Sequence, residues 1–516
     1  MKRTNLAGAG LALGRSQSYA TTAQGKDWQE NAKIENIIVL FVDQQRMDCL
    51  GCYGNPVVQT PNIDRLAQNG IRFNNAFAPT AVCTPARTSL QTGRWAHKTG
   101  VMHNTAWGSL TGGVKDPPPS TQFFSDSLSE INWKLAHIGK WHVGTEKNKP
   151  TAHGYDDLPY YPDYGYPANH PHYLAHLKKH GVSSFKLLSE KRDPSGEILY
   201  SGIPEGQRSA SIPVYLADQT VDIIKRYSGS ERPFFVSCNF WGPHEPYRIP
   251  KEYYDMYKSE NIEPWPNFDC SLADKPDMIK RYGEYWHTGW FDKKVLSGLI
   301  AEYYGYITLI DEEIGRILKT LEEAGELDST LIIYSADHGS TVGSYRMWAK
   351  GFGMYDCVTR IPLIISHSSI QPGVSDTFVS LLDFAPTFWE IAGCDVPEGV
   401  DGNSLLPLLY GSENRFSDEF IITEAFGHQV PFWQRMVRTQ HSKFVFSPAG
   451  KDEFYDLDSD PWETKNVIGK IDRKTLNRHK EIFFQWMEDN NDPIFRWCTR
   501  MIGGDVYKGK KDSFIY

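Results

Sequence analysis

The chain has 516 residues, of which 40% are hydrophobic and 23% are charged, so it can bury a large core and form more than one domain. Its formal net charge of −9 argues against a general nucleic-acid binder, because such proteins usually carry a basic surface. Beyond the first 32 residues, no stretch approaches the roughly eighteen apolar residues that a membrane span needs. We therefore expect a large globular protein with no nucleic-acid partner and no membrane span.

Residues 1–32 have the order of a secretory signal. Lys2 and Arg3 precede a short apolar run over residues 6–13, and small residues follow at 21–23. Because two glycines interrupt the apolar run, a disordered tail is the alternative interpretation. A functional signal would place the protein in the periplasm or outside the cell, and without one the protein would be cytoplasmic.

Buried strands and amphipathic helices alternate along most of the chain. Residues 35–43 are a nearly continuous apolar run that ends in an acid, which is typical of a strand buried on both faces of a parallel sheet. A short helix over residues 63–68 and an alternating strand over residues 71–77 follow. Further buried strands are predicted at residues 234–238, 330–334 and 361–365, and a long amphipathic helix at residues 295–324. This order predicts an α/β fold: a large, mixed, mostly parallel sheet flanked by helices.

The pattern changes near residue 397. Short strands separated by turns are predicted at residues 420–424, 435–438, 442–446 and 453–457, and a helix at residues 473–489. We therefore expect a catalytic domain over residues 33–396 and a smaller C-terminal α+β domain, with a short antiparallel sheet, over residues 397–516.

Two long segments, residues 145–212 and 247–294, lack a strong periodicity. Both are rich in Tyr, Pro, Trp and His. Long irregular segments in a compact enzyme are often loops that face the substrate. Surface decoration is an equally good interpretation of the same composition.

The segment from Cys83 to Arg94 carries the most specific motif in the chain. It reads C-T-P-A-R-T-S-L-Q-T-G-R, a C-x-P-x-R pattern followed by a leucine and a terminal Thr-Gly-Arg. It resembles the signature of the type I sulfatases, in which a maturation enzyme oxidises the cysteine to formylglycine after translation. The resemblance implies an aldehyde hydrate with two hydroxyls on one carbon, one to attack sulfur and one to expel the product. Taken alone, the pattern also fits a cysteine packed at the start of a helix, with Pro85 near the first turn.

Two pairs of polar residues follow predicted strands: Asp43 with Gln44, and Asp337 with His338. Strands of open α/β sheets end at the edge where ligands bind. The resemblance implies that these four residues and the oxidised Cys83 hold a divalent metal. Many sulfatases have a second Asp in place of Gln44 and an Asn in place of His338, and both variants occur in the wider superfamily. Hard oxygen ligands favour calcium, which we expect, or magnesium, whereas an imidazole also suits manganese or zinc.

Two further motifs resemble those of the sulfatases. Residues 139–144 read G-K-W-H-V-G, which implies that Lys140 binds a sulfate oxygen and that His142 is the base of the release step. Residues 243–246 read P-H-E-P, which implies that His244 faces the leaving oxygen.

Single cationic residues complete the resemblance. Lys350 matches the family's second active-site lysine, and Arg87, one helical turn after Cys83, would hold the aldehyde hydrate in place. Any one of these side chains on its own is more simply a solvated surface charge. Their joint presence, in the chain order of the family, is what favours a catalytic site.

The resemblance covers roughly residues 34–470 and implies the α/β fold of the alkaline phosphatase superfamily and the activity of a sulfatase. A sulfated sugar or polysaccharide is the expected substrate, since aromatic loops can stack on sugar rings. A phosphonate monoester or phosphodiester hydrolase of the same superfamily is the alternative enzyme, because Gln44 and His338 resemble its metal site. A non-catalytic binder of sulfated glycans is a third interpretation if Cys83 is unmodified.

Overall fold

The computed structural model describes residues 34–104, 113–160, 169–411, 416, 419–428, 430–448 and 450–501. The N-terminal segment predicted as a signal, residues 1–32, lies outside this part of the chain. Among the helices described, none is both long and apolar enough to cross a bilayer.

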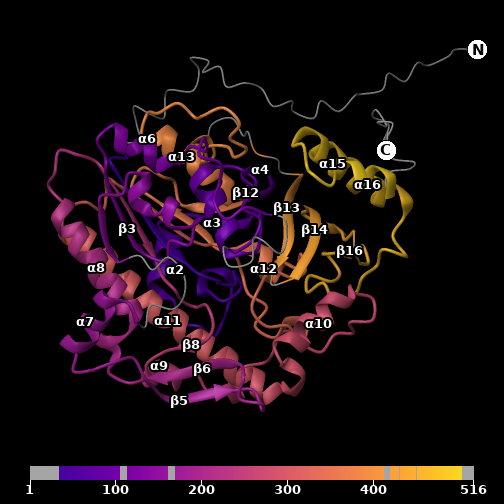
Figure 1. Cartoon of the computed structure of the whole chain (residues 1–516), viewed down its shortest axis with the longest axis horizontal. Helices are drawn as coiled ribbons and strands as arrows, with labels where there is room; N and C mark the ends of the chain where they lie inside the picture. Colours follow the sequence, from indigo (N-terminus) through magenta and orange to yellow (C-terminus); the bar gives the residue numbers. More distant parts are fainter. Residues whose placement is uncertain are drawn as a thin grey trace, which may run out of the picture.

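A nine-stranded sheet forms the centre of the molecule (Figure 1). Five neighbouring strands, β4, β3, β7, β1 and β9, run parallel, and β11 is antiparallel to both β9 and β2. The predicted mixed, mostly parallel sheet is therefore confirmed. In sheet order, the strands are β10 (Arg360–Ile361), β2 (Gly70–Phe77), β11 (Leu363–Ser366), β9 (Thr330–Ala336), β1 (Asn36–Val42), β7 (Phe234–Asn239), β3 (Lys134–Gly139) and β4 (Asp157–Tyr160), with β12 (Gly373–Ser380) beside β2.

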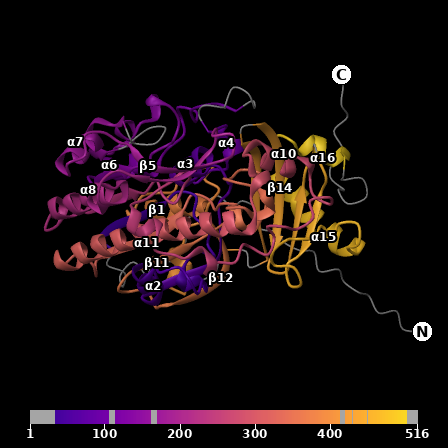
Figure 2. The ribbon, with the colours of Figure 1, turned by 90° about the horizontal axis from the view of Figure 1, so that it is seen from below.

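Helices cover both faces of this sheet (Figures 1 and 2). One layer holds α2 (Pro61–Gln68), α8 (Ile212–Tyr227) and α11 (Lys293–Glu323), and the other holds α3 (Cys83–Thr92), α6 (Phe124–Glu130) and α13 (Phe384–Ile391). All seven residues of β1 are buried, as expected for a strand covered on both faces. The long helix predicted at residues 295–324 is confirmed as α11.

A separate four-stranded antiparallel sheet lies beside the large one (Figures 1 and 2). Its strands are β13 (Phe420–His428), β14 (Val430–Thr439), β15 (Ser442–Phe446) and β16 (Glu453–Asp456), and α15 (Arg473–Asp489) and α16 (Phe495–Met501) follow in the chain. Apolar side chains of β14, β15 and β16 pack on α15 around Phe483 and Met487. The predicted antiparallel sheet and its helix are confirmed, whereas the domain boundary at residues 396 and 397 stays a prediction.

The two segments without periodicity fold into short elements. A three-stranded sheet joins β5 (Leu187–Arg192), β6 (Leu199–Pro204) and β8 (Tyr247–Arg248). Most residues of β5 are exposed, so the strand has no apolar pattern that the sequence could reveal.

The other α-helices in the described part of the chain are short. They are α4 (Ala96–Thr99), α7 (Pro171–Lys179), α9 (Lys251–Tyr254), α10 (Asp277–Tyr285), α12 (Asp356–Thr359) and α14 (Leu406–Leu409).

A buried cluster of charges joins the four-stranded sheet (the small sheet) to the start of α12. Lys443 of β15 is buried, and its ammonium donates to the carboxylates of Asp356, at 2.6 Å, and Glu463 and to the Met354 carbonyl, at 2.8 Å. Arg438 of β14 pairs with Asp356 at 3.2 Å. Buried charges are tolerated only when they are paired, so this cluster fixes the small sheet against residues 354–356.

Replacing Lys443 with methionine is expected to destabilise the protein by about 3–5 kcal/mol, because two buried carboxylates lose their shared cation. Thermal and guanidinium unfolding followed by circular dichroism measure this change. Lys280→Met on α10 is the matched control: Lys280 is 73% exposed and lies 3.9 Å from Glu284. The control should change stability by less than about 1 kcal/mol. Equal unfolding midpoints for the two variants would contradict the role of the cluster.

Candidate active site

Cys83 is the first residue of α3, a helix whose ten residues are all buried. Val82 precedes it in an extended conformation, and the Thr84 amide donates to the Asn104 side-chain oxygen at 3.1 Å. The helix dipole favours negative charge at this end. The start of α3 is therefore suited to an anionic side chain or ligand.

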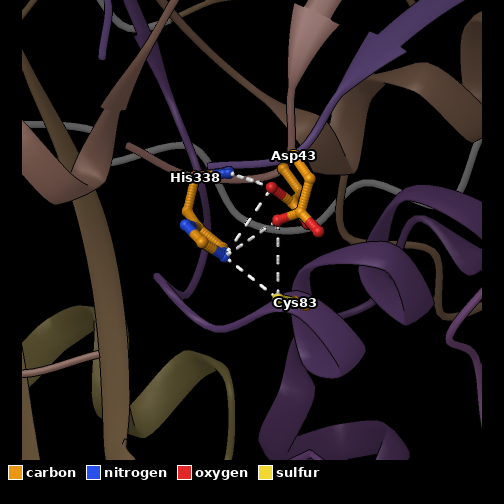
Figure 3. A group of neighbouring side chains, drawn as sticks. Asp43, Cys83 and His338 are labelled. Carbon is orange, nitrogen blue, oxygen red and sulfur yellow. Dashed lines mark hydrogen bonds and ion pairs between the residues drawn. The ribbon is translucent and has the colours of Figure 1, made fainter. Parts of the chain in front are cut away.

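The strand register brings two carboxylates to Cys83. Val42 of β1 pairs with Ala336 of β9 in parallel, so Asp43 and Asp337 leave the sheet at the same level. The Cys83 sulfur lies 3.7 Å from Asp43 Oδ1. Figure 3 shows the side chains of Asp43 and His338, from these two strand ends, converging on Cys83.

His338 presents its Nε2 atom to the same point. Its Nδ1 donates to the Gly339 carbonyl at 2.8 Å, so in the neutral ring Nε2 carries the lone pair. That atom lies 3.2 Å from the Cys83 sulfur, 3.6 Å from Asp337 Oδ1 and 3.9 Å from Asp43 Oδ1. One ligand atom from each of these four residues lies within 4.8 Å of the others. Two carboxylates, an imidazole lone pair and a sulfur position form a donor set that fits a divalent metal.

The electrostatics of the carboxylates also favour a cation. Burial and the charge of Asp43 raise the pKa of Asp337 above its ordinary value. Burial also acts to raise the pKa of Asp43, but the charges of Lys140 and Lys350 outweigh it and lower that pKa. A positive ion between the two carboxylates would stabilise both in the ionised form.

Gln44 is held in one orientation by its neighbours. Its backbone is in the left-handed region, with φ 64°, and its amide N–H donates to Asp337 Oδ1 at 3.0 Å. The side-chain Nε2 donates to the Glu245 carboxylate and to Ser340 Oγ, and Oε1 accepts from Lys350 Nζ at 2.7 Å. Since carboxylates only accept and ammonium groups only donate, Oε1 is the Gln44 atom that faces cations.

Arg87 connects the metal-type cluster to the next strand. Its Nε donates to Asp337 Oδ2 at 2.9 Å, and its Nη1 donates to the Lys140 carbonyl at 2.9 Å and to Asn239 Oδ1 at 3.4 Å. The sequence predicts a role for Arg87 at the Cys83 side chain. That role stays a prediction; the hydrogen bonds of the guanidinium are to Asp337, to Asn239 and to the backbone of the Lys140 loop.

Lys140 reaches the cluster from the end of β3. Its ammonium donates to the second oxygen of Asp43 and lies 4.8 Å from the centre of the Trp241 ring. Gly139 precedes it with φ 89°, and a Cβ at this position would lie 1.9 Å from the Asn239 carbonyl oxygen. Only glycine allows the chain to turn here so close to β7.

His142 is buried next to Cys83. Burial and the charge of Lys140 lower the pKa of His142 to about 4, although a hydrogen bond with Cys83 opposes them. Its backbone is also in the left-handed region, with φ 55°. A neutral imidazole in this place can accept a proton at neutral pH.

His244 and Lys350 close the opposite side of the site. The Lys350 ammonium donates to His244 Nε2, and His244 Nδ1 donates to the Glu245 carbonyl. Burial acts to lower the pKa of Lys350, but the charges of Cys83 and Glu245 outweigh it and raise that pKa to about 12. Lys350 is thus a fixed cation, and the His244 side chain, at 22% exposed, is in partial contact with solvent.

These cations change the chemistry of Cys83. Burial acts to raise the pKa of its thiol, but the charges of Lys140 and Lys350 outweigh burial and lower it well below its ordinary value. The position therefore stabilises negative charge on the Cys83 side chain and on a group bound to it.

The structure brings together every residue that the sequence predicts for the site: Asp43, Gln44, Cys83, Arg87, Lys140, His142, His244, Asp337, His338 and Lys350. It adds Glu245, Asn239, Ser340 and Asn104, which the sequence motifs do not predict. Of these, only Glu245 carried a signal, because it lies inside the P-H-E-P motif.

Comparison with known proteins agrees with this arrangement. A family model for sulfatases matches residues 35–394, and a model for the C-terminal part of N-sulphoglucosamine sulphohydrolase matches residues 343–486. The arylsulfatase of Clostridium perfringens is 29% identical over 459 residues, which cover 85% of this chain and 91% of that protein.

Two further proteins resemble the chain over most of its length. The N-acetylglucosamine-6-O-sulfatase of Bacteroides thetaiotaomicron is 26% identical over 514 residues, which cover 90% of this chain and 88% of that protein. The solved structure of the phosphonate monoester hydrolase SpPMH from Silicibacter pomeroyi has a TM-score of 0.74 at 22% identity. The match covers 88% of this chain and 96% of the hydrolase, so the two proteins share the fold.

Replacing Arg87 with methionine is expected to destabilise the metal-free protein by about 3–5 kcal/mol, because the buried Asp337 loses its ion pair. Guanidinium unfolding in the presence of a chelator measures the loss. Arg478→Met serves as the control, since Arg478 is 64% exposed and lies 3.3 Å from Glu419. An Arg87→Met midpoint equal to that of the control would show that Asp337 does not depend on Arg87.

Proposed function

Since the chain belongs to the sulfatase family and is a sulfuric ester hydrolase, we propose that it removes sulfate from a sulfated carbohydrate. One observation carries this proposal: Cys83 begins a buried helix within reach of two carboxylates, an imidazole and two lysines. The similarity to an N-acetylglucosamine-6-O-sulfatase supports a sugar as the bearer of the sulfate.

The proposed nucleophile is formylglycine, formed at position 83 by a maturation enzyme. The C-x-P-x-R motif and the anion-stabilising position of the side chain support this modification. When present, the hydrated aldehyde supplies one hydroxyl that attacks sulfur and a second that allows sulfate to leave. An unmodified cysteine lacks the second hydroxyl, so it could take up the sulfate group but could not easily release it.

The surrounding residues have separate tasks in this proposal. Lys140 and Lys350 neutralise the sulfate oxygens in a pocket sheltered from water, which lets a nucleophile approach an anion. His244 together with Lys350, whose ammonium proton lies on the bond to His244 Nε2, delivers a proton to the alcohol oxygen as it leaves. His142, which is neutral at pH 7, accepts the proton of the second hydroxyl in the release step. Arg87 keeps the Lys140 loop and Asp337 in register.

A divalent metal, with calcium preferred over magnesium or manganese, would be held by Asp43, Gln44, Asp337, His338 and the side chain at position 83. When bound, it lowers the pKa of a hydroxyl that touches it and neutralises charge on the ester. The cluster of four donor atoms within 4.8 Å and the inward-facing Gln44 Oε1 support this ligand set.

A phosphonate monoester or phosphodiester hydrolase is the second candidate. Gln44 and His338 stand where many sulfatases have Asp and Asn, and the phosphonate monoester hydrolase shares the fold. A glycan binder without turnover is the outcome if Cys83 stays unmodified.

We also propose that the protein is exported to the periplasm or secreted. The basic start and the apolar run of residues 6–13 support this location.

Sulfate release from a panel of sulfated di- and polysaccharides tests the activity. The wild-type protein, produced with a formylglycine-generating enzyme, is expected to release sulfate, and Cys83→Ala and Lys350→Ala are each expected to lose at least about 100-fold in kcat. Lys258→Ala, at an exposed position outside the site, is the control. Faster hydrolysis of phosphonate monoesters or phosphate diesters than of any sulfate ester would favour the second candidate. Wild-type rates in either site variant would overturn the assigned roles.

Chelation tests the metal. Removal of divalent ions is expected to lower both the turnover and the melting temperature, because a bound ion stabilises the two buried carboxylates. Titration of calcium, magnesium or manganese into the metal-free protein should restore both, with calcium the most effective. Asp43→Asn should weaken the metal-dependent rise in melting temperature. Full activity in protein shown to be free of metal would contradict the proposed site.

A further inference from the structure

The backbone of Lys350 is held by a residue that the proposed mechanism does not use. The hydroxyl of Tyr282, in α10, donates to the Lys350 carbonyl at 2.6 Å. Tyr282 is buried, and its ring lies 4.3 Å from that of Phe352, two residues after Lys350. The segment that carries Lys350 is therefore anchored by a helix that lies far from it in the sequence.

Tyr282 is in turn held by the small sheet. His428, the last residue of β13, lies with its Nδ1 at 2.8 Å from the Tyr282 hydroxyl oxygen. A carbonyl can only accept, so the single hydroxyl proton of Tyr282 lies in the hydrogen bond to the Lys350 carbonyl. His428 Nδ1 must therefore be the donor to the Tyr282 oxygen. This fixes the tautomer of His428, with the proton on Nδ1.

His428 also packs directly on the residue after Lys350. A Cβ at Gly351 would lie 2.4 Å from the Cβ of His428, so only glycine allows this approach. Burial and the charge of Lys350 lower the pKa of His428 to about 3, so its ring is neutral and does not repel the ammonium. The contact is close, specific and electrically compatible with a neighbouring cation.

The chain before Lys350 needs such support. Four residues before Lys350 have φ between 38° and 67°, the left-handed region that residues other than glycine rarely adopt: Val342, Tyr345, Arg346 and Ala349. Each such residue costs of the order of 1 kcal/mol or more and persists only where its surroundings hold it. A segment of this kind does not keep a lysine in one place without outside contacts.

We propose that Tyr282 and His428 are positioning residues for Lys350: two hydrogen bonds, His428 to Tyr282 and Tyr282 to Lys350, hold its peptide so that the ammonium reaches Gln44 and His244. The inference deepens the proposed function, on which it rests. By this inference His428, at the end of β13, supports the binding of the sulfate group indirectly, through the position of Lys350. It takes no part in the reaction itself.

The competing explanation is simple packing, because the Tyr282 ring belongs to an aromatic cluster with Phe352 and Phe432. Tyr282→Phe separates the two explanations, since it keeps the ring and removes both hydrogen bonds. His428→Asn keeps a donor near the place of Nδ1, whereas His428→Leu removes it. Tyr285→Phe is the matched control on the same helix, because Tyr285 is 51% exposed.

Turnover of a fluorogenic aryl sulfate by the mature protein is the first measurement. Tyr282→Phe and His428→Leu are expected to lower kcat about 10- to 100-fold, the size expected for a misplaced catalytic group. The kcat of His428→Asn should stay within about threefold of the wild-type value, and the kcat of Tyr285→Phe should equal the wild-type value.

A double-mutant cycle with Lys350→Met gives the decisive readout. If Tyr282 acts through Lys350, then adding Tyr282→Phe to Lys350→Met should lower kcat no further. Losses that multiply would show that Tyr282 acts independently of Lys350 and would overturn the proposal. Wild-type kcat in both Tyr282→Phe and His428→Leu would overturn it as well.

Binding of inorganic sulfate, read from its effect on the melting temperature, provides a test that needs no turnover. Tyr282→Phe should weaken sulfate binding in the wild-type background but not in Lys350→Met. A protein that binds sulfate in this pattern yet hydrolyses no sulfate ester would support the positioning role and reject the proposed function. Equal sulfate affinity in wild type and Tyr282→Phe would reject the positioning role whatever the activity.

Discussion

The parallel pairing of β1 with β9 is the constraint on which the rest of the site depends. Because Val42 lies opposite Ala336, the carboxylates of Asp43 and Asp337 emerge side by side and are both buried. Two such charges are unfavourable together unless cations neutralise them. Arg87 and Lys140 pair with these carboxylates, and Lys350 lies next to them on Gln44. The same positive charge would stabilise an anionic ester in the site.

Residues of the nine-stranded sheet and contacts from the four-stranded sheet both shape the site. The large sheet supplies the strand ends that position Asp43, Asp337 and Lys140. Lys350 instead lies in a segment with an irregular backbone, which α10 and the end of β13 hold in place. Buried charges around Lys443 tie the same segment to β15 a few residues later. The small sheet therefore contributes to the geometry of the site as well as to stability.

The sequence predicts the parts of this molecule that have a local signal. The strand at 35–43 and the helix at 295–324 are predicted to within about two residues, because continuous or periodic apolar patterns encode them. The polar pairs that end β1 and β9 are predictable for the same reason. The β12 strand is missed because its sequence, G-V-S-D-T-F-V-S, has no regular apolar alternation. Tyr282 and His428 are missed because only tertiary folding brings them to Lys350. Lone aromatic or histidine residues carry no such signal in a single sequence.

The mass of the tryptic peptide covering residues 73–87 tests the central claim most directly. In active protein, this account predicts that the peptide has lost the thiol sulfur and gained an aldehyde oxygen, and that turnover rises in proportion to the converted fraction. Full turnover of sulfate esters by protein in which every such peptide keeps its thiol would contradict the account.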